Sequence, residues 1–359
     1  MAAGRAADVL LVSLGSTAGL RRADDELADS LRRAGASVEL ARPVAPRPLP
    51  TLMLTDLEWA RSARRAAREA LERQGPARPP AVIYSTTTAA LLWRRPGAIR
   101  FDALAASNRP GRHGLWQRPL ERGRLREAPL LLPWSERSLD GLGADDADRR
   151  TLVLPVPVEP SGPLPGAAGQ PAAVAQPRAS AQPPRDIAAV TYAANPAKKG
   201  LGRVLRAWRA VRDPAGSDEL VIAGVSREQL VRDRLIAAEE PGVRVTGPLP
   251  TDDFRALLRR ACVFVCAPRR EDYGIVQLEA LADGCQLVTT AAPGPYAALP
   301  IARELDARLV GDDLAAALRM ALQQPLADYA QRARAALAPF SRDAVDRIVA
   351  DELLPRLLA

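Results

Sequence analysis

Two glutamates eight positions apart lie in the segment 262–290, between two apolar runs. Glu271 follows the first run, and Glu279 lies in the stretch that leads to the second. Carboxylates accept hydrogen bonds from hydroxyl groups. In a helix, eight residues cover about 12 Å, and less if a turn folds back. The pair therefore suits a ligand that carries a hydroxyl-rich group on each side of a diphosphate.

A helix is expected to begin between these glutamates, near Gly274, and to end at the stop signal Asp283–Gly284. The first backbone N–H groups of a helix have no partner within it, and they lie at its positive end. Gly274, Ile275 and Val276 would present such groups. This segment is therefore a candidate phosphate site.

The basic side chains are distributed unevenly. The chain of 359 residues carries 50 basic and 42 acidic side chains, a net charge of +8, and only Lys198 and Lys199 are lysines. A compact ammonium group suits phosphate as a point charge. Residues 61–126 hold 15 arginines and four carboxylates, which could attract an anionic membrane or an acidic substrate, or could form a solvated surface. No aromatic stacking platform or nucleic-acid motif accompanies them, so we expect no nucleic-acid partner.

The composition is that of a soluble globular protein, with 47% hydrophobic and 26% charged residues. No run of about 18 apolar residues predicts a membrane span. Three cysteines and one histidine provide neither a disulfide framework nor a zinc motif, so we expect no metal and three small core cysteines. We expect a cytoplasmic protein, and the basic first half leaves open a peripheral place at the inner membrane face.

Both halves alternate short apolar runs with amphipathic stretches, which is typical of parallel sheets covered by helices. Between them, residues 159–184 hold seven prolines in 26 positions and almost no charge, which predicts a linker or mobile loop. We expect two lobes with ligands in the cleft, at the carboxyl ends of the strands. The expected parts are a first lobe (1–158), the linker (159–185), a second lobe (186–340) and a terminal helix (341–359), which Ser341 and Asp343 could start. The expected strands are 8–14, 81–85, 98–101, 129–132, 151–154, 187–192, 220–224, 243–246, 263–267 and 287–290.

The segment around the two glutamates resembles the signature of retaining GT-B glycosyltransferases, especially those of family four. The family pattern is a strand, E-x-F/Y-G, an apolar helix with L-E-A-x-A-x-G, and a second strand. Lys199–Gly200 matches the K-G that opens the first helix of the donor lobe, and the loop Gly15–Gly19 matches more loosely. The matching residues here are Glu271, Tyr273–Gly274, Leu278–Glu279–Ala280, Ala282 and Gly284, and the earlier segments 220–224 and 243–247 of the same half fall in the family's order.

The resemblance implies a GT-B fold of two Rossmann-like lobes, the second binding a nucleotide diphosphate-sugar. It implies a retaining, hexosyltransferase-like enzyme that needs no metal and no cofactor besides this co-substrate. Glu279 would bind the ribose hydroxyls, Glu271 the transferred sugar, and Lys199 the diphosphate. The backbone at Gly274, Ile275, Val276 and Gly15 would approach the same diphosphate.

Two departures from the family concern charged groups. The family has an arginine five or six residues before the lysine, where this chain has Ala193 and Ala194. Arg270 and Lys198 are the candidates to replace it, and a solvated neighbour of Lys199 is the alternative for Lys198.

The family also often has a histidine after a strand of the first lobe, where this chain has Asp102. Asp102 could orient an acceptor hydroxyl or the donor sugar, or could cap a strand end. The single histidine, His113, is an acceptor-side candidate or an ordinary loop residue.

Two other classes of function fit parts of the sequence. One is a GT-B protein with another reaction, such as a sugar-nucleotide epimerase or a glycan phosphorylase-like enzyme. The other is a non-catalytic protein that binds sugar nucleotides or membrane surfaces, which the missing arginine and histidine favour. The acceptor is not identified, and the basic first half makes an anionic or membrane-embedded acceptor one expectation.

Overall fold

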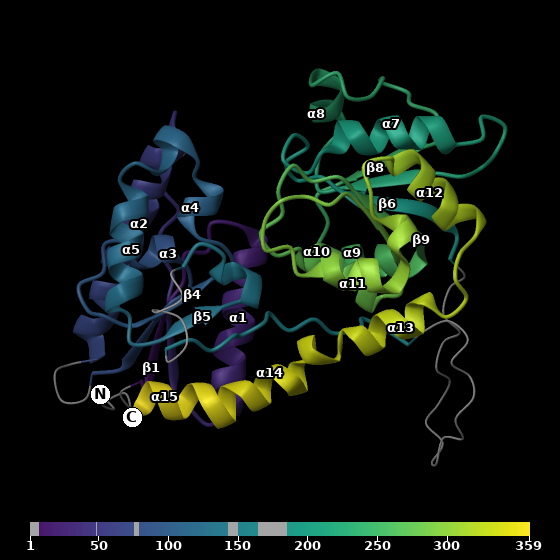
Figure 1. Cartoon of the computed structure of the whole chain (residues 1–359). Helices are drawn as coiled ribbons and strands as arrows, with labels where there is room; N and C mark the ends of the chain where they lie inside the picture. The colour runs from purple at the N-terminus through teal and green to yellow at the C-terminus, as the bar shows by residue number, and fades with distance from the viewer. Residues whose placement is uncertain (1–6, 48, 75–78, 143–149, 164–184) are drawn as a thin grey trace, which may run out of the picture. The chain divides into compact units, whose positions relative to one another are not determined.

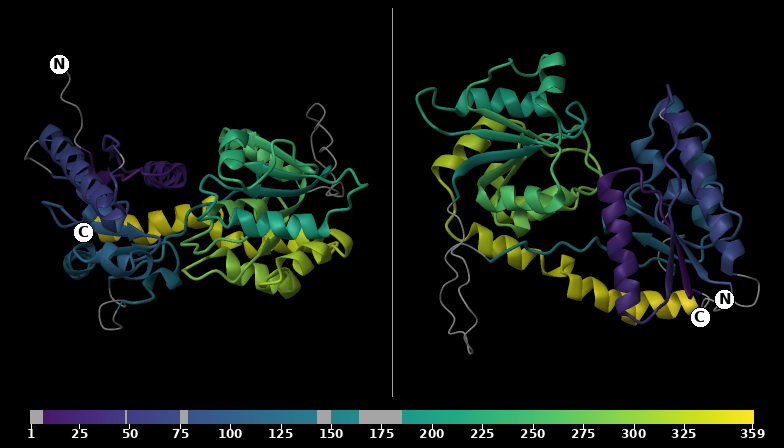
Figure 2. Two further views of the ribbon diagram at one scale, coloured as in Figure 1. Left: turned by 90° about the horizontal axis from the view of Figure 1, so that it is seen from above. Right: turned by 180° about the vertical axis from the view of Figure 1, so that it is seen from behind.

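The computed structural model describes residues 7–47, 49–74, 79–142, 150–163 and 185–359. The chain divides into two compact units, Met1–Pro157 with Pro339–Ala359, and Val158–Ala338. Each unit is a parallel five-stranded sheet with helices on both faces (Figures 1 and 2).

The first unit has the strand order β2-β1-β3-β4-β5, and all its strands are parallel. The order changes direction between β1 and β3, so the carboxyl ends of these two strands form the switch point at which such sheets bind ligands. Its elements are β1 (Val9–Val12), α1 (Ala18–Arg33), β2 (Val38–Ala41), α2 (Leu52–Gln74), β3 (Ala81–Tyr84), α3 (Thr87–Ala90), β4 (Ala98–Phe101), α4 (Ala105–Asn108), η1 (Gly111–Gly114), α5 (Gln117–Glu127), β5 (Leu131–Pro133) and η2 (Glu136–Leu139).

Alternate residues of β1 enter two different cores, because successive strand side chains point to opposite faces. Leu10 and Val12 pack with α2, α3 and α5, whereas Val9 and Leu11 pack with α1. Val345 and Val349 from the end of the chain join this second core. The last residues therefore belong to the hydrophobic core of the first unit.

The end of the chain is helical throughout, as α14 (Arg342–Ile348), a π-helical turn η5 (Val349–Leu353) and α15 (Leu354–Leu358). Ser341 caps α14 by accepting a hydrogen bond from the N–H of Ala344, as predicted. Asp346 anchors α14 to α1 through Arg33, whose Nε donates to the carboxylate at 2.6 Å, and through the hydroxyl of Ser30. These hydrogen bonds hold the pKa of Asp346 below its usual value.

The pKa of Asp346 is lower in the folded chain than in the unfolded chain, so its ionised carboxylate stabilises the fold. This contribution is complete above about pH 4 and is lost as the pH falls through the pKa of the folded chain. We expect Asp346→Asn to lower the free energy of unfolding near neutral pH by about 1 kcal/mol, since the pair is partly exposed. The difference from wild type should shrink at low pH in urea unfolding curves. Asp351→Asn, an exposed site in the next turns, should have little effect at either pH. A difference that persists at low pH would contradict this role of Asp346.

The second unit has the strand order β10-β9-β6-β7-β8, again all parallel. The order changes direction between β6 and β9, so the loops after these two strands form its switch point. α7 and α8 lie on one face of this sheet, and α9 and α10 on the other (Figure 1). Its elements are β6 (Ile187–Tyr192), α7 (Leu201–Val211), β7 (Leu220–Ala223), α8 (Arg227–Arg232), β8 (Val243–Gly247), α9 (Thr251–Arg260), β9 (Ala261–Cys266), α10 (Ile275–Ala282), β10 (Gln286–Thr289), α11 (Ala298–Asp306), η3 (Ala307–Leu309), α12 (Leu314–Gln323), α13 (Tyr329–Ala336) and η4 (Ala338–Phe340), whose last residues lie in the first unit.

Most predicted strands form within one or two residues of their expected bounds. The structure differs from the prediction in two places. It contains one short strand, β2, that was not expected. The predicted strand 151–154 forms only a bridge between Thr151 and Leu131, with Leu152 and Leu154 donating to the carbonyls of β5. A full ladder is prevented because Pro133 has no N–H to donate.

Two further expectations concern membrane spans and cysteines. Within the described residues, no helix is long and apolar enough to cross a membrane. Cys262, Cys266 and Cys285 are free thiols; the last two are buried and the first is partly buried. Burial raises the pKa of Cys285 to about 12, so this thiol is inert near neutral pH.

Candidate functional site

The switch point of the second sheet brings together two of the residues selected from the sequence. Lys199 lies in the loop after β6, and Glu271 lies in the loop after β9. The ammonium Nζ of Lys199 donates to Oε2 of Glu271 at 2.6 Å. The lysine side chain is 21% exposed and that of the glutamate 9%. An ammonium group has three donors, so the lysine can keep this contact and still bind a phosphate oxygen.

The two loops are also joined through their backbones. The N–H of Arg269 donates to the carbonyl of Lys198 at 3.0 Å. Gly200, the N-cap of α7, has φ +67, and a Cβ built on it would lie 1.8 Å from the carbonyl oxygen of Ala267. Only glycine fits this close approach in a left-handed conformation. Gly200 therefore lets the lysine loop lie directly against the end of β9.

We expect Gly200→Ala to lower the free energy of unfolding by at least about 2 kcal/mol, because the methyl group would meet a backbone atom that cannot move aside. Gly202→Ala is the matched control in the same helix, since its Cβ would lie 3.7 Å from a leucine methyl group. That change should be neutral or stabilising by up to about 1 kcal/mol. Urea unfolding of both variants checks the prediction, and equal stabilities would contradict it.

α10 begins and ends as the sequence predicts. Gly274 is its N-cap with φ +91, and a Cβ there would lie 2.8 Å from the ring of Tyr296. At the other end, Gly284 has φ +81, and its N–H donates to the carbonyl of Leu281, as in a Schellman motif. The N-terminal N–H groups at Ile275 and Val276 therefore lie only a few residues after Glu271.

Further contacts hold Glu271 in place. The amide Nε2 of Gln277, on α10, donates to the same carboxylate oxygen as Lys199 at 3.0 Å. The backbone N–H of Glu271 donates to the carbonyl of Pro293. A Cβ on Gly294 would lie 2.3 Å from the carbonyl oxygen of Glu271, so this loop packs tightly over the glutamate. The side chain of Gln277 is buried and was not selected from the sequence.

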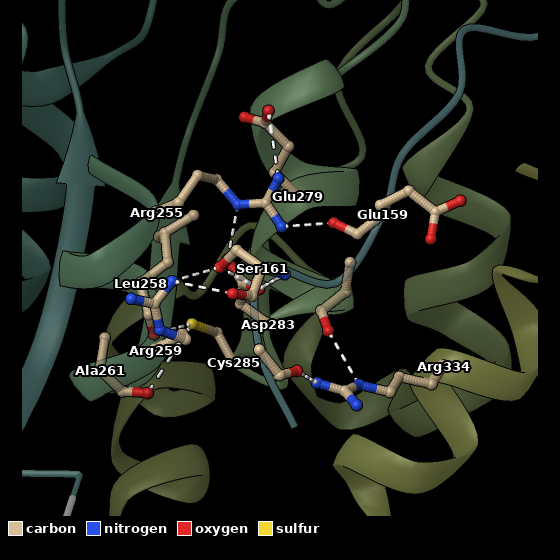
Figure 3. Close-up of polar contacts among 12 residues, drawn as sticks. Glu159, Ser161, Arg255, Leu258, Arg259, Ala261, Glu279, Asp283, Cys285 and Arg334 are labelled. Carbon is tan, nitrogen blue, oxygen red and sulfur yellow. Dashed lines mark hydrogen bonds and ion pairs between the residues drawn. The ribbon is translucent and has the colours of Figure 1, made fainter. Parts of the chain in front are cut away.

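Glu279 is buried and lies beside a second basic residue, Arg255 of α9, at 3.6 Å (Figure 3). Arg255 Nε also donates to Asp283 at 2.6 Å, and its Nη2 donates to the carbonyl of Glu159 at 2.6 Å. Burial alone would lower the pKa of Arg255, but the hydrogen bond and charge of Asp283 outweigh it, so the pKa is raised. Arg255 is thus a permanent cation that holds three acceptors from two segments, α10 with its C-cap and the chain at Glu159.

The same cluster attaches the start of the predicted linker to the second unit. The N–H and hydroxyl of Ser161 donate to Asp283 at 2.7 and 2.8 Å, and Arg259 donates to that hydroxyl (Figure 3). Arg334 donates to the carbonyl of Gly162. These residues are thus hydrogen-bonded, and residues 164–184 of the predicted linker lie outside the described part of the chain.

A family model described as Glycosyl transferases group 1 matches residues 185–328. This segment is therefore similar to that family. The match covers less than half of the chain and falls within the second unit. No curated protein matches the chain significantly.

Solved structures of similar fold cover almost the whole chain. WaaG, a glycosyltransferase involved in lipopolysaccharide biosynthesis, has a TM-score of 0.65 at 16% identity, covering 97% of this chain and 99% of that one. Sucrose-phosphate synthase from Thermosynechococcus elongatus has a TM-score of 0.61 at 16% identity, covering 97% of this chain and 98% of that one. A structure from E. coli described as trehalose-6-phosphate has a TM-score of 0.62 at 14% identity, covering 96% of this chain and 98% of that one. With the two parallel sheets, these likenesses confirm the predicted α/β GT-B fold.

Within the segment that the family model matches, the two residues expected to substitute for the family arginine differ in their surroundings. Arg270 donates to Asp272 at 2.7 Å, and Lys198 is exposed. Arg269 was not selected, yet it lines a pocket of 670 Å³ together with Ala194, which stands where the family has its arginine. Its exposed side chain belongs to the turn that the sequence had identified. Arg269 is therefore a third candidate for the missing cation.

Glu279 has a basic neighbour that the sequence did not indicate. Arg255 occurs in an amphipathic helix between buried apolar residues, and nothing in that pattern distinguishes it from the exposed arginines of the chain. Its role depends on Asp283, which the sequence marked only as part of a helix stop.

The three residues predicted for the site in the first unit lie in three different segments of that unit. Gly15 follows β1 with φ +61, and its carbonyl accepts from Arg21 at 2.8 Å. Asp102 is half-buried directly after β4. His113 is exposed in the short helix η1. Gly15 and Asp102 therefore lie at the carboxyl edge of their sheet, whereas His113 lies in a surface turn.

Among the residues that the structure describes, no group of three or more His, Cys, Asp and Glu side chains could hold a metal ion.

Proposed function

We propose that the protein is a retaining glycosyltransferase that moves a sugar from a nucleoside diphosphate-sugar to an acceptor without a metal. The observation that carries the proposal is the ion pair of Lys199 and Glu271 at the switch point of the second sheet. It joins a cation for the diphosphate to an acceptor for sugar hydroxyls, close to the N-terminus of α10. The E. coli structure of similar fold is bound with UDP-2-fluoro glucose, which supports this class of donor.

Each group has a defined task in the proposed reaction. Lys199 and the first N–H groups of α10 stabilise the negative charge that develops on the nucleoside diphosphate as the sugar–phosphate bond breaks. Glu271 accepts hydrogen bonds from the transferred sugar, and Gln277 keeps its carboxylate in place. Glu279 binds the ribose hydroxyls, and Arg269 adds positive charge in place of the missing arginine.

The first unit supplies the acceptor side in this proposal. Gly15 lets the backbone approach the diphosphate, and Asp102 orients an acceptor hydroxyl. The acceptor class is anionic or membrane-embedded, in keeping with the arginines of residues 61–126, and His113 contacts it from the surface. WaaG, of similar fold, takes part in lipopolysaccharide biosynthesis, which supports an acceptor of this kind. The protein would then act in the cytoplasm, peripherally at the inner membrane face.

The proposal is tested by a thermal-shift panel of nucleoside diphosphates and their sugars. We expect one base to stabilise the protein, and Glu279→Ala to weaken that binding in calorimetry. Incubation with the donor alone should release nucleoside diphosphate slowly, at a rate that EDTA leaves unchanged. Binding without release would favour the non-catalytic alternative, and an absence of binding to every nucleotide tested would overturn the site.

A further inference from the structure

A pocket of about 420 Å³ lies in the first unit, between the second half of α2 and the loop that leads from α3 to β4. Its size falls within the usual range for small-molecule sites, about 300–1,000 Å³. Buried aromatic rings form part of its wall, and arginines surround it. The lining residues are Arg64, Ala67, Arg68, Leu71, Glu72, Tyr84, Trp93, Arg94 and Arg95.

The charge of this pocket is strongly positive, with four guanidinium groups and one carboxylate. Arg68 and Glu72 form an exposed pair at 3.6 Å. Among the described residues, none of the ion pairs involves Arg64, Arg94 or Arg95, the other three cations. Arginine is the side chain whose planar fork matches the oxygens of phosphate. Three unneutralised arginines on two walls of one pocket therefore favour a phosphate-bearing ligand.

The wall that carries Arg94 and Arg95 is fixed in position. The hydroxyl of Tyr84 donates to the carbonyl of Arg95 at 2.9 Å, and the rings of Tyr84 and Trp93 lie 5.4 Å apart. Arg124 stacks over Trp93 at 5.2 Å and donates to the carbonyl of Leu91. A loop held in this way loses little freedom when a ligand binds. The pocket is thus built before any ligand arrives.

Two arginines of the pocket enter away from the expected reaction site, although Tyr84 on another wall is the last residue of β3. Arg94 and Arg95 precede Ala98, the first residue of β4, whereas Asp102 follows the last residue of that strand. Four strand residues span roughly 13 Å. Substrates of the transfer reaction are expected at the carboxyl edge of a parallel sheet, and these two arginines enter from the amino end of β4.

We propose that this pocket is a second ligand site that binds the phosphate group of a phosphorylated molecule. The bound group is a phosphate monoester or diester, carried by a soluble compound or by the headgroup of an anionic lipid. Arg64 from α2 and Arg94 from the loop hold its oxygens from opposite walls. The pocket does not depend on the transfer reaction proposed for the second unit.

The test compares variants of equal charge in a Lys199→Ala background, which removes the lysine of the donor site. Arg64→Glu and Arg94→Glu alter the pocket. Arg65→Glu changes an exposed neighbour on the same helix that does not line it. We expect the first two to weaken binding of glycerol phosphate at least tenfold in calorimetry at fixed salt, and the control by less than twofold. Unchanged melting temperatures will show that the fold is kept.

A second measurement distinguishes the two sources of phosphate. Vesicles of phosphatidylcholine with and without phosphatidic acid are mixed with the same variants and sedimented. Retention that depends on phosphatidic acid and is lost in Arg64→Glu and Arg94→Glu, but not in Arg65→Glu, identifies a lipid headgroup. Pocket-dependent binding of glycerol phosphate alone identifies a soluble ligand. Equal behaviour of the pocket variants and the control with both probes would overturn the proposal.

Discussion

Lys199→Ala is expected to lower the rate of sugar transfer by roughly 10²–10³-fold, the usual cost of removing one preorganised group that stabilises developing charge. Its ammonium group lies 2.6 Å from Glu271 and is held there because Gly200 packs against the end of β9. Removal leaves the diphosphate without its nearest lysine. It also leaves the carboxylate of Glu271 with Gln277 as its remaining side-chain donor on α10.

Lys198→Ala is the matched control, since Lys198 is the adjacent lysine and its side chain is exposed. The two variants lose the same charge, so a long-range electrostatic effect would lower both rates. We expect Lys198→Ala to keep the rate within about twofold, because solvent and salt screen an exposed charge. Initial rates of nucleoside diphosphate release at saturating donor provide the measurement. Equal losses in both variants would show that Lys199 acts only through net charge.

Arg255→Met is expected to lower the free energy of unfolding by about 3–5 kcal/mol, as is usual when one partner of a buried ion pair is removed. The side chain of Arg255 is 6% exposed and that of Asp283 is 0% exposed. Methionine preserves much of the volume but leaves Asp283 with the donors of Ser161 and leaves Glu279 without its neighbouring cation (Figure 3). The loss is therefore electrostatic rather than a loss of packing.

Arg259→Met is the control for this change, because Arg259 is on the same helix and donates to Ser161 from a more exposed position. We expect it to cost less than about 1 kcal/mol. Nucleotide affinity is the second readout: Arg255→Met should weaken binding of the nucleotide with its ribose hydroxyls more than binding of the 2′-deoxy form. An equal loss for both nucleotides would mean that Arg255 stabilises the fold without acting on Glu279.

The segment 262–290, which contains Glu271 and Glu279, shows how much a local sequence pattern can predict. Gly274 and Gly284 define the start and end of α10 because each adopts a positive φ that glycine accommodates best, and such a requirement is visible in the sequence itself. The order of strands and helices also predicted that the loops after β6 and β9 would lie at one edge of a sheet. Lys199 and Glu271 are 72 positions apart, yet their side chains lie within hydrogen-bonding distance at this edge.

The predicted linker shows where composition is insufficient. Proline-rich, uncharged sequence indicates a segment that cannot form its own core, and this reasoning treats all of 159–185 alike. In the structure, Glu159 and Ser161 are bound by Arg255 and Asp283. Those partners come from α9 and from the end of α10, about 95 to 120 positions later, so no local signal could reveal them.

The sequence by itself determined the fold class, the limits of α10 and the loops that carry Lys199 and Glu271 at one edge of the sheet, because these depend on backbone conformation and on the order of strands. Only the tertiary structure decided which of many arginines matter. Arg255 is buried by its acceptors, Arg269 lines the pocket beside Ala194, and Arg64 and Arg94 face one cavity from two elements. The task of a charged side chain depends on which partners the fold brings within a few ångströms, and side-chain type alone does not encode that distance.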